Sequence, residues 1–299
     1  MATVSLGSVG KPAMSWPLFV GQEKGIFAKH HIALENVQAQ ASAGVVQQLV
    51  AGSVDIATSG LADPMHAIDA GAKIKAIASI GAQAAFSIIA KKGISSWADL
   101  KGKKVIVGGP KDVTLYYFEA VAAEHGLKGS DFSYVYAGAT PNRFAALQSG
   151  SVDAAILSLP FNFKAVGEGG TNLGDVPDTI PGVPFQGISV NTAWADANGE
   201  VLLDFLRAYL ESVAWINDEA NRDEAIAILA KETGSSKEDA SDTYDFYKKV
   251  DMFPKDESLN EAGVDLLIKN LVANGTLTGP AKPATAYIDN SYLAKALKG

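Results

Sequence analysis

Two stretches of the chain share the pattern Leu-x-x-Gly-Ser-Val-Asp-x-Ala, and each leads to a serine placed after an apolar run. The first stretch is LVAGSVDIATSGL at 49–61, and the second is LQSGSVDAAILSLP at 147–160. A serine hydroxyl both donates and accepts hydrogen bonds, so Ser59, with Gly60 beside it, and Ser158 are suited to hold a polar small molecule. The repeat therefore indicates two matching recognition loops.

Asp55 and Asp153 occupy the same place in the two stretches. In each case a glycine ends a helix, and the aspartate then enters a short apolar strand. We interpret both aspartates as structural residues. Ligands of open α/β sheets sit at the carboxyl ends of the strands, so ligand contact is assigned to the serine loops instead.

The stretch GGPKDVTLYYFEAV at 108–121 combines a tight glycine turn with a helix that begins near residue 112. Free N–H groups and partial positive charge at a helix N-terminus bind oxyanions, so Lys111, Asp112 and Thr114 are candidate contacts. Asp112 has two possible roles: it is the N-cap of the helix, or it meets a basic nitrogen of the ligand. We expect at least one of Tyr116 and Tyr117 to be in the core.

A second group of candidates lies in the loop VGKPAMSWPLF at 9–19, which contains Lys11, Ser15 and Trp16. Trp16 supplies either a flat apolar wall of a ligand site or a cap on the core. For Lys11 we favour a solvated side chain over a cation that binds an anionic group. Thr140 begins a predicted helix, where a capping role is favoured over ligand contact.

The elements that position these residues alternate between strand and helix, which is typical of a doubly wound α/β layer. Helices are predicted between most consecutive strands, whereas a polar, turn-rich piece joins the strands at 87–90 and 104–107. The segment 166–187 is predicted to be loop because it is rich in glycine and proline, and helices follow the strand near 187–194. The other strands are predicted at 3–9, 32–39, 54–59, 74–81, 87–90, 104–107, 133–137 and 152–158.

Composition limits the classes of function. The length of 299 residues suggests about two domains. A net charge of −8 argues against nucleic acid as a partner and requires that any anion site be made locally. The chain has no cysteine, no apolar run of the length of about 18 residues that spans a bilayer, and no visible signal peptide at its start.

An enzymatic constellation is not visible. The histidines, His30, His31, His66 and His125, lack metal-ligand spacing, and there is no Gly-x-Ser-x-Gly, phosphate loop or dinucleotide motif. We therefore predict no catalytic residue, no metal and no cofactor.

Four segments in the correct order resemble one known family. They are PLFVGQEKGIFAKHHIALENV (17–37), LVAGSVDIATSG (49–60), SSWADLKGKKVIVGG (95–109) and LDFLRAYLESVAWINDEANRDEAIAILAKETG (203–234). In these segments the chain resembles the periplasmic substrate-binding proteins of the nitrate/sulfonate/taurine (NitT/TauT-type) ABC importers, which include thiamine-pyrimidine binders.

The resemblance implies a two-lobed periplasmic binding protein fold of type II, with mixed sheets flanked by helices and two hinge crossings. Lobe 1 would comprise 1–91 and 189–299, and lobe 2 would comprise 92–188. A small solute would be captured between the lobes by hinge closure, and Gln83, Phe161 and Gln186 are further candidate contacts near the crossings or beyond Ser158.

The implied partners are a small-molecule solute and an ABC permease, and the protein is expected to be a monomer, periplasmic or lipid-anchored outside the cytoplasm. In the family, the turn that corresponds to 108–114 grips sulfonate-type groups, so a small organic anion such as a sulfonate is the leading solute. An aminopyrimidine thiamine precursor is the alternative. Related pyrimidine synthases carry a cysteine-rich motif that this chain lacks, and a ligand-sensing module stays open.

Overall fold

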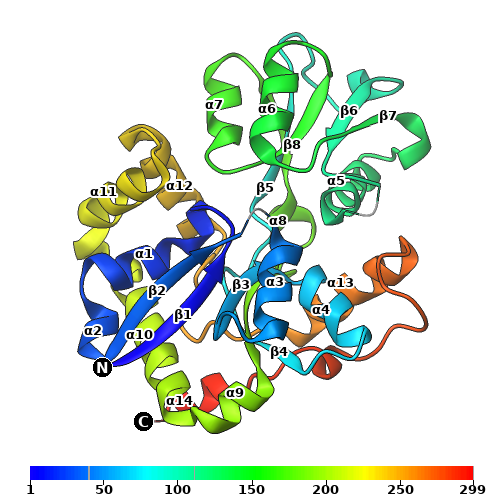
Figure 1. Ribbon diagram of the computed structural model, residues 1–299. Helices are drawn as coiled ribbons and strands as arrows, with labels where there is room; N and C mark the ends of the chain where they lie inside the picture. Colours follow the sequence, from blue (N-terminus) through cyan, green and yellow to red (C-terminus); the bar gives the residue numbers. More distant parts are fainter. Residues whose placement is uncertain (40, 111, 299) are drawn as a thin grey trace. The chain divides into compact units, whose positions relative to one another are not determined.

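The predicted alternation of strands and helices builds two five-stranded sheets in the computed structural model, which describes residues 1–39, 41–110 and 112–298 (Figure 1). In each sheet, one strand runs antiparallel to the other strands. Within the described ranges, no helix combines the length and the apolar character needed to cross a bilayer.

Contacts divide the chain into two units. Unit 1 comprises Met1–Gln83, Pro184–Ile268 and Pro280–Gly299, and unit 2 comprises Ala84–Val183 and Lys269–Gly279. The boundaries expected from the sequence, after 91 and after 188, lie a few residues beyond the changes of unit after Gln83 and Val183. The sequence analysis also assigned 269–279 to the first lobe, whereas contacts assign it to unit 2.

Unit 1 contains the sheet with strand order β2-β1-β3-β10-β4. Because β1 and β3 are parallel, their carboxyl ends, at Ser8 and Gly60, lie at the same edge of the sheet. β10 lies antiparallel between β3 and β4. The strands are β1 (Ala2–Ser8), β2 (Ile32–Gln38), β3 (Ile56–Gly60), β4 (Ile74–Ser79) and β10 (Gln186–Asn191).

Helices cover both faces of the unit 1 sheet. α3 (Ser42–Ala51) and α4 (Ala62–Asp69) pack on one face over a buried apolar cluster that includes Val45, Leu49 and Ile74. Gly7 approaches Val45 on that face, so Leu6 points to the opposite face, where it lies beside Leu18 and Phe19 of α1 (Trp16–Glu23).

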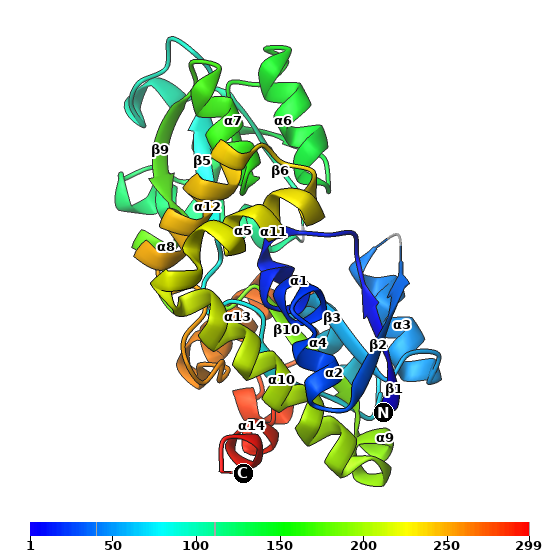
Figure 2. The ribbon, with the colours of Figure 1, turned by 90° about the vertical axis from the view of Figure 1, so that its left-hand side faces the viewer.

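Unit 1 contains several further helices. α11 and α12 lie side by side next to α1, as Figures 1 and 2 both show. α13 (Glu261–Ala273) begins in unit 1 and ends in unit 2. The other bounds are α2 (Ile26–Lys29), α9 (Thr192–Ala197), α10 (Gly199–Asn217), α11 (Arg222–Thr233), α12 (Lys237–Lys249) and α14 (Ser291–Ala296), with 3-10 turns at Ala13–Ser15, Glu219–Asn221 and Ala284–Ala286.

Unit 2 contains the sheet with strand order β7-β6-β8-β5-β9, in which β5 is the antiparallel strand. The carboxyl ends of β6, β7 and β8 therefore share one edge. The strands are β5 (Phe86–Ala90), β6 (Lys104–Val107), β7 (Ser133–Tyr136), β8 (Ala154–Ser158) and β9 (Thr171–Asp175), with 3-10 turns at Ala98–Leu100 and Gly129–Asp131.

The helices of unit 2 also divide between the two faces of their sheet. α6 (Thr140–Gln148) and α7 (Phe161–Gly167) cover the face of Ile89, in one apolar cluster with Leu147. The ring of Phe86 points to the other face because side chains alternate along a strand, and there it contacts Tyr117 of α5 (Val113–Glu124). The short α8 (Val176–Thr179) packs beside α5.

The predicted loop at 166–187 was wrong, because the segment holds β9, α8 and the start of β10. β9 is ordered by pairing with β5, which is a tertiary interaction that composition does not reveal. The sequence analysis also did not predict α2, α7, α9, α12 and α14 as separate helices.

The repeated aspartates clamp the entrance of a central strand in each unit. Asp55 accepts hydrogen bonds from the backbone N–H and the hydroxyl of Ser5 in β1, at 2.8 and 2.7 Å. Asp153 accepts one from the backbone N–H of Lys104 in β6, at 2.9 Å, and pairs with Lys91 at 2.6 Å. Both carboxylates thus bind the neighbouring parallel strand, in agreement with their structural interpretation.

A buried carboxyl group ties the loop before α13 to the end of β4. Glu257 is fully buried, accepts a hydrogen bond from the Ser79 hydroxyl at 2.8 Å, and has one side-chain oxygen without a partner among the described residues. Burial raises the pKa of Glu257 well above its usual range, against the lowering effect of the Ser79 hydrogen bond.

We predict that Gly21→Ala destabilises the protein. A methyl group at Gly21 of α1 would overlap the side chains of Phe27 and Ser212, and such overpacking costs about 1–3 kcal/mol. The matched control is Gly44→Ala in α3, where the nearest atom is 3.7 Å away and alanine should stabilise the helix by about 0.5–1 kcal/mol. Urea denaturation measures both. Equal effects of the two substitutions would contradict the packing at Gly21.

We predict opposite pH dependences for Glu257→Gln and Glu211→Gln. Because the folded pKa of Glu257 is raised, wild type should lose stability relative to Glu257→Gln as pH rises from about 4. For Glu211, burial raises the pKa, but hydrogen bonds from Lys29 and His30 outweigh it and lower the pKa. Wild type should therefore lose stability relative to Glu211→Gln as pH falls below about 4. Parallel curves from denaturation at several pH values would refute both assignments.

Candidate functional site

A hydrogen-bonded group lies at the strand-end edge of unit 2, where α6 begins and β8 ends. The hydroxyl of Thr140, the first residue of α6, accepts a hydrogen bond from the Ser158 hydroxyl at 3.0 Å and another from the guanidinium of Arg143 at 2.8 Å. Thr140 and Ser158 are half-buried, whereas Arg143 is only 2% exposed. The structure thus brings together two predicted residues, and a third residue that the sequence analysis did not single out supports them.

Among the residues that the structure describes, no carboxylate forms a direct ion pair with Arg143. Its other hydrogen bonds go to the backbone carbonyls of Ile156, Ala137 and Gly138. Burial lowers the pKa of Arg143 to about 10, while the charge of Asp112 opposes this shift. The guanidinium therefore remains charged at neutral pH, inside a protein of net charge −8.

The glycine turn before α5 is stabilised by its own side chains. Asp112 is the N-cap of α5 and accepts a hydrogen bond from the backbone N–H of Thr114 at 2.9 Å. The buried Thr114 hydroxyl donates to Asp112 and accepts from the backbone N–H of Gly108. This arrangement agrees with the capping role considered for Asp112. Lys111 lies outside the described residues.

Tyr117 and the predicted contact Phe161 both pack in the interior of unit 2. Tyr117 is fully buried, and its hydroxyl has no hydrogen-bond partner among the described residues; Tyr116 is half-buried. Phe161 begins α7 and contacts Phe144 in the apolar cluster under α6 and α7, with ring centroids 5.4 Å apart.

The strand-end edge of unit 1 carries the second predicted serine loop. Ser59 is 2% exposed, and its hydroxyl has no partner among the described residues. The next residue, Gly60, pairs with Gln186 of β10 and donates its backbone N–H to the Ser42 hydroxyl at 3.1 Å. Gln83, predicted as a further contact, is half-buried in the loop after β4. Ser59, Gly60 and Gln186 are thus brought together.

The predicted residues Lys11 and Ser15 lie beside the carboxyl ends of β1 and β2, at the same edge of the unit 1 sheet. Lys11 forms a salt bridge of 2.6 Å with Glu232 of α11, and Ser15 is buried. Both line a cavity of about 90 Å³ beside β1 and β2, together with Ser8 and Gln38. The Lys11 ammonium group is therefore engaged by a carboxylate.

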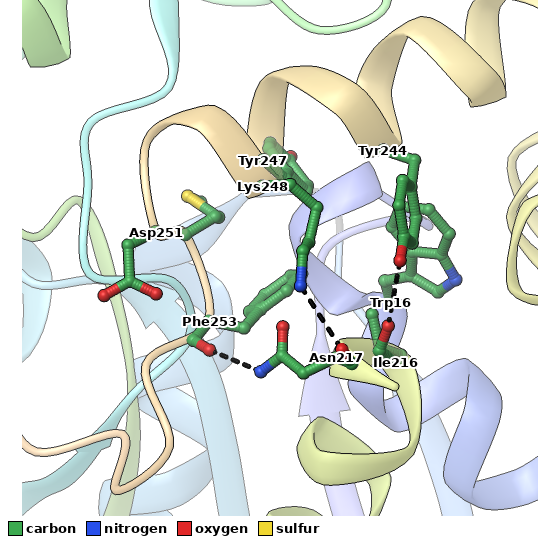
Figure 3. A pocket seen from close by; sticks show the side chains of 9 residues that line it. Trp16, Ile216, Asn217, Tyr244, Tyr247, Lys248, Asp251 and Phe253 are labelled. Carbon is green, nitrogen blue, oxygen red and sulfur yellow. Dashed lines mark hydrogen bonds between the residues drawn. The ribbon is translucent and has the colours of Figure 1, made fainter. Parts of the chain in front are cut away.

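Trp16 is fully buried, and its indole N–H donates to the carbonyl of Ala225 at 3.0 Å. Its ring meets that of Tyr244 edge to face, with centroids 5.8 Å apart. Figure 3 shows the two rings side by side in the wall of a small cavity of about 40 Å³. Lys248 reaches into the same view and donates to the carbonyl of Asn217. The indole therefore packs as part of the core.

Arg143 had one signal in the sequence. It lies four residues before Leu147, so both project from the same face of a helix, and Leu147 is in the core. A cation on an apolar helix face is unusual unless buried groups bind it. The described residues contain no group of three or more His, Cys, Asp or Glu that could hold a metal ion.

Comparison with known proteins shows what this architecture is similar to. The chain is 28% identical over 251 residues to an Escherichia coli (strain K12) protein named for binding aliphatic sulfonates, which covers 78% of this chain and 77% of the relative. The ligand-binding component of an ABC-type import system from Staphylococcus aureus, solved with zinc bound, has a TM-score of 0.83 at 17% identity and covers 99% of both chains.

The crystal structure of the periplasmic aliphatic sulphonate-binding protein SsuA from Escherichia coli has a TM-score of 0.77 at 20% identity, with 96% of this chain and 92% of that chain covered. These likenesses confirm the predicted fold class, in which mixed sheets are flanked by helices. The family model described as NMT1/THI5 like matches residues 13–222. Since this match spans more than half of the sequence and agrees with the family recognised from the sequence motifs, the chain belongs to the NMT1/THI5-like family.

Proposed function

We propose that the protein is an extracytoplasmic solute-binding protein of an ABC importer, and that its solute is a small organic anion of the sulfonate type. The observation that carries the proposal is the buried charge of Arg143, which no described carboxylate pairs with, beneath the hydroxyls of Thr140 and Ser158. A buried cation without an ionic partner is costly, and a bound anion would offset that cost.

The named relatives support the class of function. One is named for binding aliphatic sulfonates, another is a component of an import system, and a third is described as periplasmic. The proposed partners are accordingly a small solute and a membrane permease, and the proposed working form is a monomer outside the cytoplasm. Solute binding would favour a closed form because a ligand stabilises the state that it binds more tightly.

An aminopyrimidine is the second candidate solute, because Asp112 offers a carboxylate to a basic nitrogen. Two observations disfavour an aminopyrimidine: one oxygen of Asp112 accepts hydrogen bonds from Thr114, and Arg143 places a positive charge near that carboxylate. An enzyme of the pyrimidine-synthase type is disfavoured because the chain has no cysteine. A sensing protein would bind the same solutes and would differ in its membrane partner.

We predict that an organic sulfonate raises the melting temperature of protein that has been unfolded and refolded to remove carried-over solute. At about one hundred times its dissociation constant, a ligand adds about 2.7 kcal/mol, which for a chain of this length raises the melting temperature by about 4 °C. The panel contains alkyl and aryl sulfonates, taurine, nitrate, bicarbonate, carboxylates and aminopyrimidines. A shift with aminopyrimidines alone would favour the second solute, and no shift with any member would overturn both.

We predict that Ser59→Ala weakens sulfonate binding by about 10- to 100-fold, because a hydrogen bond to a charged group contributes about 1.5–3 kcal/mol. The matched control is Ser189→Ala. Ser189 is also buried with an unpartnered hydroxyl, but it lies within β10, away from the strand end. Isothermal titration calorimetry should show unchanged affinity for the control. Equal affinities of the two variants would remove Ser59 from the site.

A further inference from the structure

Resting on the proposed function, we propose that Arg143 is a positioning residue: it fixes the Thr140 hydroxyl as a donor to the anionic group of the solute and thereby sets the preference for an anion over an uncharged solute. Arg143 itself need not touch the solute. The role follows from its hydrogen bonds and from where its charge is held.

The guanidinium is held in one orientation. Of its five N–H groups, four have partners: the Nε group bonds the Ile156 carbonyl at 2.8 Å, one terminal nitrogen bonds the carbonyls of Ala137 and Gly138, and the other bonds the Thr140 hydroxyl. Three backbone carbonyls therefore fix the group, and Thr140 is its one side-chain acceptor among the described residues.

The oxygen of Thr140 is saturated as an acceptor. A hydroxyl has two lone pairs and one proton. The lone pairs of Thr140 accept from Arg143 at 2.8 Å and from Ser158 at 3.0 Å. The Thr140 proton is thereby directed away from both neighbours, and because Thr140 is half-buried, the proton is available to an acceptor from outside the unit.

The same end of α6 has no competing acceptor of its own. Its N-cap residue is Ala139, and no side chain caps the helix there, whereas α5 is capped by Asp112. A solute oxyanion at Thr140 would also meet the positive end of the α6 dipole. The uncapped helix supports the assignment, while Arg143 and Thr140 carry it.

The charge of Arg143 distinguishes this donor from an ordinary hydroxyl. Carbonyl oxygens satisfy the N–H groups of a guanidinium, but they do not cancel its charge, and a buried charge is screened little by salt. The Thr140 donor is thus backed by a positive charge, which favours an oxyanion. An uncharged solute of the same shape gains the hydrogen bond but not this attraction.

The test compares a sulfonate with its uncharged analogue. Calorimetry measures the binding of 1-butanesulfonate and of butane-1-sulfonamide to wild type, Thr140→Val, Thr140→Ser and Arg143→Met. We expect Thr140→Val and Arg143→Met to lose about 10- to 100-fold in affinity for the sulfonate. Arg143→Met should lose less affinity for the sulfonamide, because that probe loses only the positioned hydrogen bond and not the attraction of the charge. Thr140→Ser keeps the donor and should restore sulfonate binding.

Thr179→Val controls for the loss of a threonine hydroxyl in unit 2, because Thr179 is half-buried and donates to Glu124 at 2.9 Å; it should bind like wild type. If Arg143→Met does not fold, the two Thr140 variants decide the assignment. Suppose that wild type binds the sulfonate. The role of Arg143 alone is then overturned if Thr140→Val binds it with unchanged affinity, or if Arg143→Met weakens the binding of both probes equally. Wild type that binds neither this probe nor any anion of the thermal-shift panel overturns the proposed function as well.

Discussion

A carboxylate at the entrance of a central parallel strand determines the geometry of each unit. Asp55 binds the backbone of Ser5, and Asp153 binds that of Lys104, so each fixes one strand against its parallel neighbour. The register that follows brings Ser59 to the carboxyl end of β3 and places Ser158 at the end of β8. Each copy of the repeated sequence therefore has two parts. The aspartate at the start of the strand sets the register, and the serine at its end places a hydroxyl at the edge of the sheet where ligands of such folds bind.

One such edge, in unit 2, holds a buried positive charge. The protein carries a net charge of −8, which repels anions at long range, so attraction must be local. A surface lysine such as Lys11 does not provide it, since Glu232 neutralises that lysine. Arg143 is placed differently: carbonyl oxygens hold it and leave its charge in place. The buried charge of Arg143 therefore provides a local positive potential in unit 2.

Much of the fold was predictable, because alternation and helical spacing are local signals. All described strands except β9 lie close to a predicted strand. β9 was missed because its order comes from pairing with β5, and the antiparallel insertion of β10 between β3 and β4 is equally nonlocal. At the candidate site, strand-end positions were readable for Ser59 and Ser158. Arg143 was missed because a lone arginine on a short helix normally indicates a solvated face.

The aromatic side chains show why residue type alone is a weak guide to a ligand site in this chain. Trp16 stood in a loop that suggested a ligand wall, yet its indole N–H is bonded to Ala225 and its ring packs against Tyr244. A large ring gains most from burial when a core is available, and the helices beside α1 provide one. Small hydroxyl residues gain little by packing, so a serine or threonine at a strand end, with a saturated acceptor or an unpartnered oxygen, is the more informative sign. At Thr140, a saturated hydroxyl acceptor lies beside the buried charge of Arg143. Because both lone pairs of that hydroxyl are used, its proton remains for an acceptor from outside the unit.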